Sequence, residues 1–468
     1  MTQKLSSTPS PAKPFPARFT IPLLLGSTLN PINSSMLATG LAAIARDFHV
    51  GPGQSAALVS VLYLCSSVAQ PTMGKLAQLF GPRRIFLVGI AILAAGGIVG
   101  ATAPQFWVLL VSRALIGVGS SAAYPTGMAL VRRRAESLGV GVPSRVIGNF
   151  SIAAQITVVL GLPIGGVLTG LFGWRALFLV NIPLAVGVFL FAFFGIAKDE
   201  ARRKRARGRA LVAAVDIPGI ALFAAAIVSL LLFLSDLRAP LWWLLPVFVA
   251  ATAGFVLWER RTSQPLVDIR MLAANGPLQR TYLRQIIVGL GVYTGLYGIS
   301  QWMEDAAGYS AFEVGLLLLP LSGTGIVLAR IVSVRGWVRW PLIVGAVALI
   351  GTGVAALFID HRAGVLVLLG LTLLFGTTNG LSNFANQTTL YVQSPSETFA
   401  VASGLYRTAS YLGAIFSASV ISLSFGSRVS DAGFHAVAWV LVAIGVGALL
   451  MTTLDRRIPV VARGRARG

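Results

Sequence analysis

Charged residues are scarce in this sequence of 468 residues. Only 11% of the residues are Asp, Glu, Lys or Arg, 56% are hydrophobic, and the mean hydropathy is +0.81. A soluble domain usually carries about 25% charged residues. The composition therefore excludes a soluble protein and predicts an integral membrane protein.

The few charges divide the chain into long uncharged stretches. A helix that spans a bilayer needs about 20 mostly apolar residues, and most of the stretches reach this length. We therefore predict an all-α polytopic membrane protein with fourteen spans. The stretches are 19–45, 48–74, 85–112, 114–131, 146–174, 176–197, 217–235, 239–258, 285–303, 314–329, 340–359, 363–396, 408–427 and 436–454.

Cysteine, histidine and the common catalytic motifs are also nearly missing. Cys65 is the only cysteine, and His49, His361 and His435 are far apart, which argues against disulfides and metal sites. No lysine precedes Ser or Thr, so there is no Walker A motif, and no Gly-x-Ser-x-Gly or His-Glu-x-x-His pattern occurs. The sequence thus predicts neither an enzyme nor an ATP-driven pump, and no cofactor or metal.

The basic residues are unevenly distributed along a chain whose net charge is +22. If the N-terminus is cytoplasmic and all fourteen stretches span, five Lys and Arg lie in outside loops and two within spans. The cytoplasmic side then holds the other 30 of the 37. This bias predicts two cytoplasmic termini in a plasma (bacterial inner) membrane. We interpret the basic run 202–209 as an anchor near anionic lipid, not as a nucleic-acid site.

Arg113 is the only charged residue between positions 85 and 131. A guanidinium stays protonated, so within a bilayer it must find a partner or line a wet cavity. The residues that follow it, 114–123, are mostly small, which favours close packing inside a bundle. We interpret Arg113 as part of a polar pathway; the alternative is that it only braces neighbouring helices.

Several predicted spans carry polar faces. Asn30 precedes Pro31 in the first span, and Asn379, Asn383 and Asn386 share one helix face in the twelfth. Broken helices with polar faces line cavities in transporters, although such side chains also form hydrogen bonds between helices. For the Asn face we favour the cavity. The predicted cavity contacts are Asn30, Tyr63, Gln70, Asn149, Gln155, Trp302 and Asn383.

A faint internal repeat indicates two related halves. The segment 74–84 after the second stretch is echoed by 325–339 after the tenth. Repeated halves around a central site are typical of secondary transporters. We predict a tail (1–18), six spans (19–197), a basic linker (198–216), a two-helix insert (217–258), a cytoplasmic loop (259–284), six further spans (285–454) and a basic tail (455–468).

Five segments, in order, resemble motifs of the major facilitator superfamily, particularly its 14-span drug/proton antiporter branch. GKLAQLFGPRR (74–84) is similar to the loop motif GxLaDrxGrr, RALIGVGSSAA (113–123) to the fourth-span motif, and GLPIGG (161–166) to the fifth-span antiporter motif. GWRALFLVNIP (173–183), and DIPG (216–219) together with LWERRTSQPLVDIRM (257–271), resemble the branch's sixth span and insert. The resemblance covers nearly the whole chain. It implies two six-helix bundles plus a two-helix insert.

The resemblance also implies roles for the matching residues. Arg113 would sense the charge state of a central cavity and take part in proton coupling and gating. The loop motif would form a cytoplasmic latch, and the fifth-span motif would seal the outer side by close packing. The residues with these conformational roles are Gly74, Gly81, Arg83, Arg84, Gly117, Gly161, Pro163, Gly165 and Gly166.

The sequence departs from the family pattern at acidic positions. Asn30 stands where the branch commonly has a first-span Asp, and Gln78 replaces the Asp of the loop motif. No carboxylate lies in the middle of a predicted span. Proton coupling needs a group whose protonation changes during the cycle. Glu304, which extends the ninth span, is our candidate; the alternative is a solvated charge at a helix end.

We therefore expect a secondary transporter, monomeric, that exports lipophilic or amphipathic small molecules such as drug-like compounds. It would work by proton antiport through alternating access, with its substrate, protons and the lipid bilayer as partners. The alternative is an exporter or uniporter of an endogenous metabolite. A membrane sensor or scaffold that moves no cargo is a third interpretation.

Overall fold

The computed structural model describes residues 14–50, 52–199, 214–235, 237, 240–309, 311–426 and 428–461. Within these ranges the secondary structure is helical, apart from one isolated bridge between Trp337 and Val461. The predicted all-α architecture is thus confirmed. Ten helical stretches of the described chain are long and apolar enough to cross a membrane. The predicted number of fourteen crossings stays a prediction.

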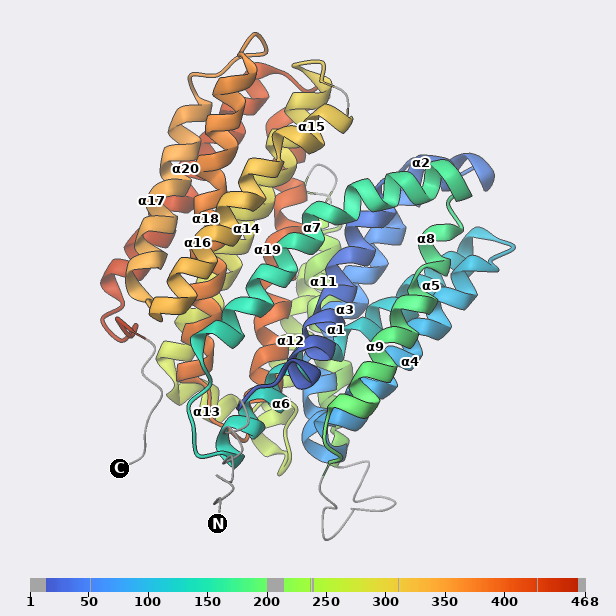
Figure 1. The fold of residues 1–468 in the computed structure, drawn as a ribbon, viewed down its shortest axis with the longest axis vertical. Coiled ribbons are helices and arrows are strands. Elements are labelled where there is room, and N and C mark those ends of the chain that lie inside the picture. Colours follow the sequence, from blue (N-terminus) through green and yellow to red (C-terminus); the bar gives the residue numbers. More distant parts are fainter. Residues whose placement is uncertain are drawn as a thin grey trace, which may run out of the picture.

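Two helical bundles, one from each half of the chain, lie side by side (Figure 1). An apolar cluster with Phe86 and Ile116 fills the N-terminal bundle and continues into the C-terminal half at Phe384, and a second cluster with Phe375 and Leu441 lies within the C-terminal bundle. The N-terminal helices are α1 (Ala17–Ala38), α2 (Leu41–Asp47), α3 (Pro52–Phe80), α4 (Pro82–Ala101), α5 (Phe106–Ser121), α6 (Ala123–Ser137), α7 (Ser144–Phe172), α8 (Ala176–Leu179) and α9 (Asn181–Gly195). The C-terminal helices are α14 (Gly276–Asp305), α15 (Ala311–Leu317), α16 (Leu319–Arg335), α17 (Arg339–Ala356), α18 (Val365–Gln393), α19 (Phe399–Phe425) and α20 (Asp431–Leu454).

The predicted insert packs along the seam between the two bundles. It consists of α11 (Ile217–Ser235) and α12 (Leu244–Arg261), and the short helix α13 (Ile269–Ala274) follows it. Helix α11 contacts both α3 and α19, and its Phe223 and Ile227 belong to an apolar cluster with Val68 and Leu412. The insert therefore touches both halves of the molecule.

Local sequence signals set several helix ends. The Asn275 side chain accepts a hydrogen bond from the Leu278 N–H at the start of α14 (3.1 Å), where Pro277 suits the first turn. Gly81, between α3 and α4, has φ = 98°, and Gly336, after α16, has φ = 67°. Both are conformations that glycine adopts without strain.

Not every charged residue that ends an uncharged stretch ends a helix. Arg113 and Arg407, the two basic residues predicted within spans, lie inside α5 and α19; Lys75 and Arg284, predicted in cytoplasmic loops, also lie inside helices, α3 and α14. The predicted loop 259–284 accordingly contains α13 and the start of α14. These side chains find carbonyl, amide or aromatic partners within the protein, so none of them needs water at a helix end. Most of the basic linker lies outside the described residues.

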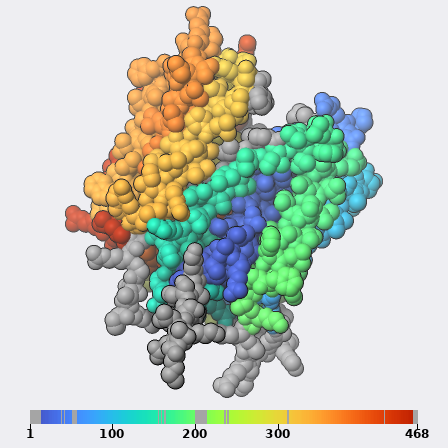
Figure 2. Space-filling view, in the orientation of Figure 1, coloured from blue at the N-terminus to red at the C-terminus, as the bar shows by residue number. Residues whose placement is uncertain are grey.

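The bundles meet at one end of the molecule and diverge at the other (Figures 1 and 2). Helix α1 begins and α20 ends at the closed end, here named the terminal end; the opposite end is the distal end. Gly74 of α3 faces the Ala400 carbonyl oxygen, and Gly404 of α19 faces that of Gln70. A Cβ at either glycine would lie 2.5 Å from that oxygen. Glycine is therefore required where α3 and α19 close the terminal end.

Candidate functional site

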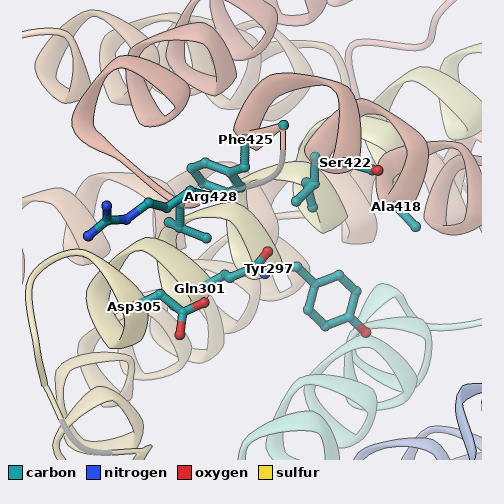
Figure 3. Close-up of a pocket in the computed structure, with 10 residues that line it drawn as sticks. Tyr297, Gln301, Asp305, Ala418, Ser422, Phe425 and Arg428 are labelled. Atoms are coloured by element: carbon teal, nitrogen blue, oxygen red, sulfur yellow. The ribbon is translucent and has the colours of Figure 1, made fainter. Parts of the chain in front are cut away.

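A cavity of about 640 Å³ lies between α14 and α19 near the distal end (Figure 3). Tyr297, Gln301 and Asp305 follow one another at four-residue spacing, so they share one face of α14. In Figure 3 the Tyr297 side chain points away from α14 toward the N-terminal half. The cavity is lined by Tyr297, Gln301, Asp305, Ala418, Ile421, Ser422, Phe425, Gly426, Arg428 and Val429.

Four tyrosines from three helices extend inward from this cavity, beginning with Tyr297 in its wall. We name them the tyrosine cluster: Tyr63, Tyr293, Tyr297 and Tyr411. The ring centroids of Tyr63 and Tyr411 are 5.4 Å apart, and those of Tyr293 and Tyr297 are 5.9 Å apart in a stacked arrangement. Tyr63 also interacts with Tyr297, which links the two pairs. Each tyrosine offers an apolar ring and a polar hydroxyl, a combination suited to amphipathic aromatic molecules.

Three of the predicted cavity residues converge on this cluster. Asn30 donates to Ser66 Oγ (2.9 Å) and Ser120 Oγ (2.8 Å), and its Oδ1 accepts from the Tyr411 hydroxyl (2.8 Å). Gln70 Nε2 donates to the same hydroxyl (3.3 Å). Tyr63, the third residue, hydrogen-bonds to Ser34. The Asn30 amide both donates and accepts, whereas an ionised Asp only accepts, so an amide fits this network.

Arg113 is fully enclosed, with 1% of its surface exposed. Its Nε donates to the Leu58 carbonyl oxygen (3.0 Å) and its Nη1 to that of Asn33 (3.4 Å), so the side chain ties α5 to α3 and α1. Its Nη2 has no hydrogen-bond partner, and Arg113 forms no ion pair within the described part of the chain. Tyr63 lies within electrostatic reach. Arg113 thus braces two helices and places an unneutralised charge behind the tyrosine cluster.

Arg407 is a second cation at this depth, and it was not among the predicted site residues. Its guanidinium carbon lies 4.0 Å from the centroid of the Tyr124 ring, and Tyr293 and Tyr411 lie within electrostatic reach. The side chain is half-buried, and its Nε has no hydrogen-bond partner among the described residues. The sequence does contain a signal for this residue, because Arg407 is the only charged residue between Glu397 and Arg428.

Two predicted residues lie away from the tyrosine cluster. Trp302 is 0% exposed, stacks on Phe434 with centroids 4.2 Å apart, and donates to Asp431 Oδ1 (2.9 Å), so it belongs to the core of the C-terminal bundle and not to a cavity wall. Glu304 is exposed at the distal end of α14. The side chain of Gln155 lies outside the described residues.

The asparagine face of α18 is divided between two environments. Asn383 donates to Asn379 Oδ1 (2.6 Å) and is half-buried. Asn386 is fully buried; it accepts from Arg284 Nε (2.8 Å) and donates to Gln285 Oε1 (2.7 Å). At Asn386 the structure therefore matches the alternative interpretation, a hydrogen bond between helices. The predicted contact Asn149 lies at the seam between the bundles, where it accepts from Arg330 (3.4 Å).

The loop-motif residues divide into two groups. Gly74 contacts α19 across the terminal end, as described above, and the neighbouring Gln78 donates to the Glu397 carbonyl oxygen (2.7 Å). Gly81, Arg83 and Arg84 instead stay within the N-terminal half and surround Asp199. Its carboxylate accepts from the backbone N–H groups of Arg83 (3.3 Å) and Arg84 (3.0 Å).

Arg132 adds a contact across the terminal end that the sequence analysis did not identify. It donates to the Ser394 carbonyl oxygen (2.9 Å) and to Ser396 Oγ (3.1 Å). Its guanidinium also lies 4.6 Å from the Phe399 ring centroid. In the sequence Arg132 was one of several basic residues that indicated orientation, and nothing in the pattern distinguished it.

The glycines of the fourth and fifth predicted spans differ in their packing. Gly117 faces the Leu62 carbonyl oxygen, Gly161 faces Ser35, and Gly165 faces the Met36 carbonyl oxygen, so each allows a close helix contact. At Gly166 a Cβ would meet nothing within 4 Å, which contradicts its predicted role in close packing. Pro163 lies within α7, but its side chain is outside the described residues.

Comparison with known proteins identifies the family that has this architecture. The sequence profile of the Major Facilitator Superfamily matches residues 23–418. An uncharacterized transporter of that type, YwoD of Bacillus subtilis, is 34% identical over 441 residues, which cover 91% of this chain and 94% of the relative. The chain belongs to the Major Facilitator Superfamily. It is therefore an integral membrane transporter, and not an enzyme.

Other known proteins are similar to this chain over most of their length. The tetracenomycin C resistance and export protein of Streptomyces glaucescens is 28% identical, with 90% of this chain and 77% of the relative covered. The lincomycin resistance protein of Streptomyces lincolnensis is 29% identical, with 91% and 89% covered. Among solved structures, the proton:xylose symporter XylE shares the fold with a TM-score of 0.66 at 12% identity, covering 96% of this chain and 97% of that one.

Proposed function

We propose that this transporter exports lipophilic or amphipathic small molecules by alternating access, as a fourteen-span member of the drug/proton antiporter branch in the plasma membrane. The observation that carries the proposal is the arrangement of the bundles, which touch at the terminal end and diverge around a cavity and a tyrosine cluster at the distal end. The bias of basic residues supports a cytoplasmic terminal end, which is part of the proposal. This conformation then faces outward.

Relatives support export over uptake. Their descriptions include export of, or resistance to, tetracenomycin C and lincomycin, and multidrug resistance. Resistance to a compound that acts inside the cell follows from outward transport. Identities of 27–29% leave the cargo of this chain as part of the proposal.

The transport cycle requires the terminal end to open. The contacts between Gly74 and Ala400, between Gln78 and Glu397, and from Arg132 to the start of α19 would then break, and the tyrosine cluster would become accessible from the cytoplasm. Gly161 and Gly165 allow α7 to approach α1 closely, which suits a seal on the outer side. Arg113 connects three helices and would transmit a change at Tyr63 to α1 and α3.

We propose that Glu304 and Arg113 together couple transport to protons. Glu304 lies at the distal end, where protons would enter from outside. However, α1, α3, α5, α7, α16, α18 and α19 contain neither Asp nor Glu. This favours a uniporter as the second candidate function.

Efflux of a neutral lipophilic dye such as Nile red tests the proposal. Cells that express the protein should lose dye faster than empty-vector cells, and an uncoupler should slow the loss. Arg113→Ala should abolish efflux at unchanged membrane levels. Glu304→Gln should abolish the uncoupler-sensitive part, whereas Asp360→Asn, an exposed loop acid, should not. Efflux that persists without a proton gradient would establish the uniporter, and wild-type efflux by Arg113→Ala would remove Arg113 from the mechanism.

A further inference from the structure

We propose that the cargo is an aromatic anion or weak acid, and that its negative group binds Arg407 beside the tyrosine cluster. This inference rests on the proposed export function and specifies its substrate class. Three observations carry it: the sign of the charge in the pathway, the half-buried guanidinium of Arg407 without an ion pair among the described residues, and the arrangement of aromatic rings around it.

The charge of the pathway below its mouth is positive. Arg113 and Arg407 both lie at the level of the tyrosine cluster, and neither forms an ion pair within the described residues. The carbonyl oxygens that accept from Arg113 orient it but do not neutralise it. Helices α3, α5 and α19 have no Asp or Glu, and the only acids of α14 are its last two residues, Glu304 and Asp305. A cation at this depth would therefore meet two like charges in a medium that screens them weakly.

The other buried arginine near the pathway is already compensated. Arg284 donates to Asn386 Oδ1 (2.8 Å) and lies 3.8 Å from Asp455 Oδ2. Arg330, exposed at the seam between α7 and α16, donates to Asn149 and adds no negative charge. At the mouth, Asp305 and Arg428 both line the cavity, so that the entrance carries both signs. Selection by charge thus takes place deeper than the mouth.

Arg407 has the geometry of a receptor for an anion. Its Nε–H is enclosed and has no partner among the described residues, so this donor is not open to a ligand; the side chain as a whole is half-buried and forms no ion pair with the described residues. A carboxylate or phenolate at the open part of the guanidinium would accept a charge-assisted hydrogen bond, which is stronger than one between neutral groups. The ring of Tyr124 holds the guanidinium from one side by a cation–π contact.

The preference for an aromatic cargo follows from the side chains along the path that leads to Arg407. Tyr293 and Tyr297 continue the α14 stripe inward from Gln301, and Tyr411 lies one turn beyond Arg407 on α19. Along a helix, 11 residues correspond to about 16 Å, so the path between Ala418 in the cavity wall and Arg407 is long enough to hold a molecule with two or three fused rings. Stacked and tilted tyrosines along that path favour a flat aromatic body whose acidic group points inward.

Two dyes with the same xanthene ring but opposite charge test this proposal. Cells are loaded with fluorescein, generated inside from its diacetate, or with the cation rhodamine 123, and efflux is measured beside that of Nile red. We expect export of fluorescein and little export of rhodamine 123. Arg407→Gln should lower fluorescein efflux about 10- to 100-fold, because a charge-assisted hydrogen bond is lost, while Nile red efflux falls far less. Arg407→Lys should restore part of the fluorescein efflux. Arg362→Gln, which removes a charge from an exposed distal loop, should change neither.

The outcomes separate the inference from the function on which it rests. Export of Nile red would leave the export function standing. Together with that export, any one of three results would overturn the anionic cargo: a preference for rhodamine 123, no export of either xanthene dye, or fluorescein efflux that is unchanged in Arg407→Gln. Loss of all three activities at normal membrane levels of the wild-type protein would overturn the export function itself.

Discussion

Replacing Gly404 by valine should push the two bundles apart at the terminal end. A Cβ at this position would lie 2.5 Å from the Gln70 carbonyl oxygen and 2.6 Å from Pro71 Cα, which are backbone atoms that cannot move without moving α3. Overpacking of this kind costs about 1–3 kcal/mol. The cost falls only on the conformation in which α3 touches α19, so the ratio of closed to open terminal ends should fall about 5- to 150-fold.

Cross-linking across the terminal end measures this ratio. Gln78 Nε2 lies 2.7 Å from the Glu397 carbonyl oxygen, so cysteines at these two positions, in a Cys65→Ala background, should be joined by a short bifunctional thiol reagent. Gly404→Val should reduce the yield. Gly187→Ala is the matched control, because a Cβ at Gly187 meets nothing within 4 Å. Undiminished cross-linking in Gly404→Val would refute the role of the α3–α19 contact as the closed gate.

Three further predictions concern the insert, the C-terminal bundle and the driving force. Lys75→Met should loosen the insert and cost about 3 kcal/mol of stability in a denaturation assay, because the buried ammonium donates to carbonyl oxygens of residues 264 and 265 (3.1 and 2.7 Å). Asp455→Asn should destabilise the protein by a similar amount, since it leaves buried Arg284 without its carboxylate; Asp360→Asn, exposed, should change stability by less than about 0.5 kcal/mol. If the cargo is a monoanion, collapsing the membrane potential with valinomycin and high potassium should slow fluorescein efflux, because 100 mV contributes about 2.3 kcal/mol per charge.

The architecture was predictable because bilayer insertion depends on composition and length, which are properties of contiguous sequence. The limits of helices were less predictable. Arg284 was predicted to lie in a loop, yet it lies inside α14; Arg113, which separates two of the uncharged stretches, lies inside α5. Distant residues supply their partners, Leu58 in the case of Arg113 and Asn386 in the case of Arg284. Contacts between residues 55 or 102 positions apart leave no local trace in the sequence.

The candidate site was predictable in part, because unusual side chains within an apolar segment are visible in the contiguous sequence. Asn30, Tyr63 and Gln70 were identified because polar residues are rare in apolar helices, and their hydrogen bonds do converge. Trp302 fits the same description, but its partners Phe434 and Asp431 lie far along the chain and draw it into the core. A polar or amphipathic side chain in a membrane helix thus indicates that a partner exists, but not whether that partner is protein or cargo.

The two fully buried arginines show how that distinction can be made. Arg284 has a carboxylate, an amide and a hydroxyl as partners, so its charge is compensated within the C-terminal bundle and its role is structural. Among the described residues Arg113 has only carbonyl oxygens as partners and keeps one donor unused, although burying a charge without a counter-ion costs several kcal/mol. A protein that required only a brace could use an uncharged side chain here. This cost fits the proposed role of Arg113 beside the tyrosine cluster, and Arg407, which forms no ion pair with the described residues, adds a second positive charge from the opposite bundle.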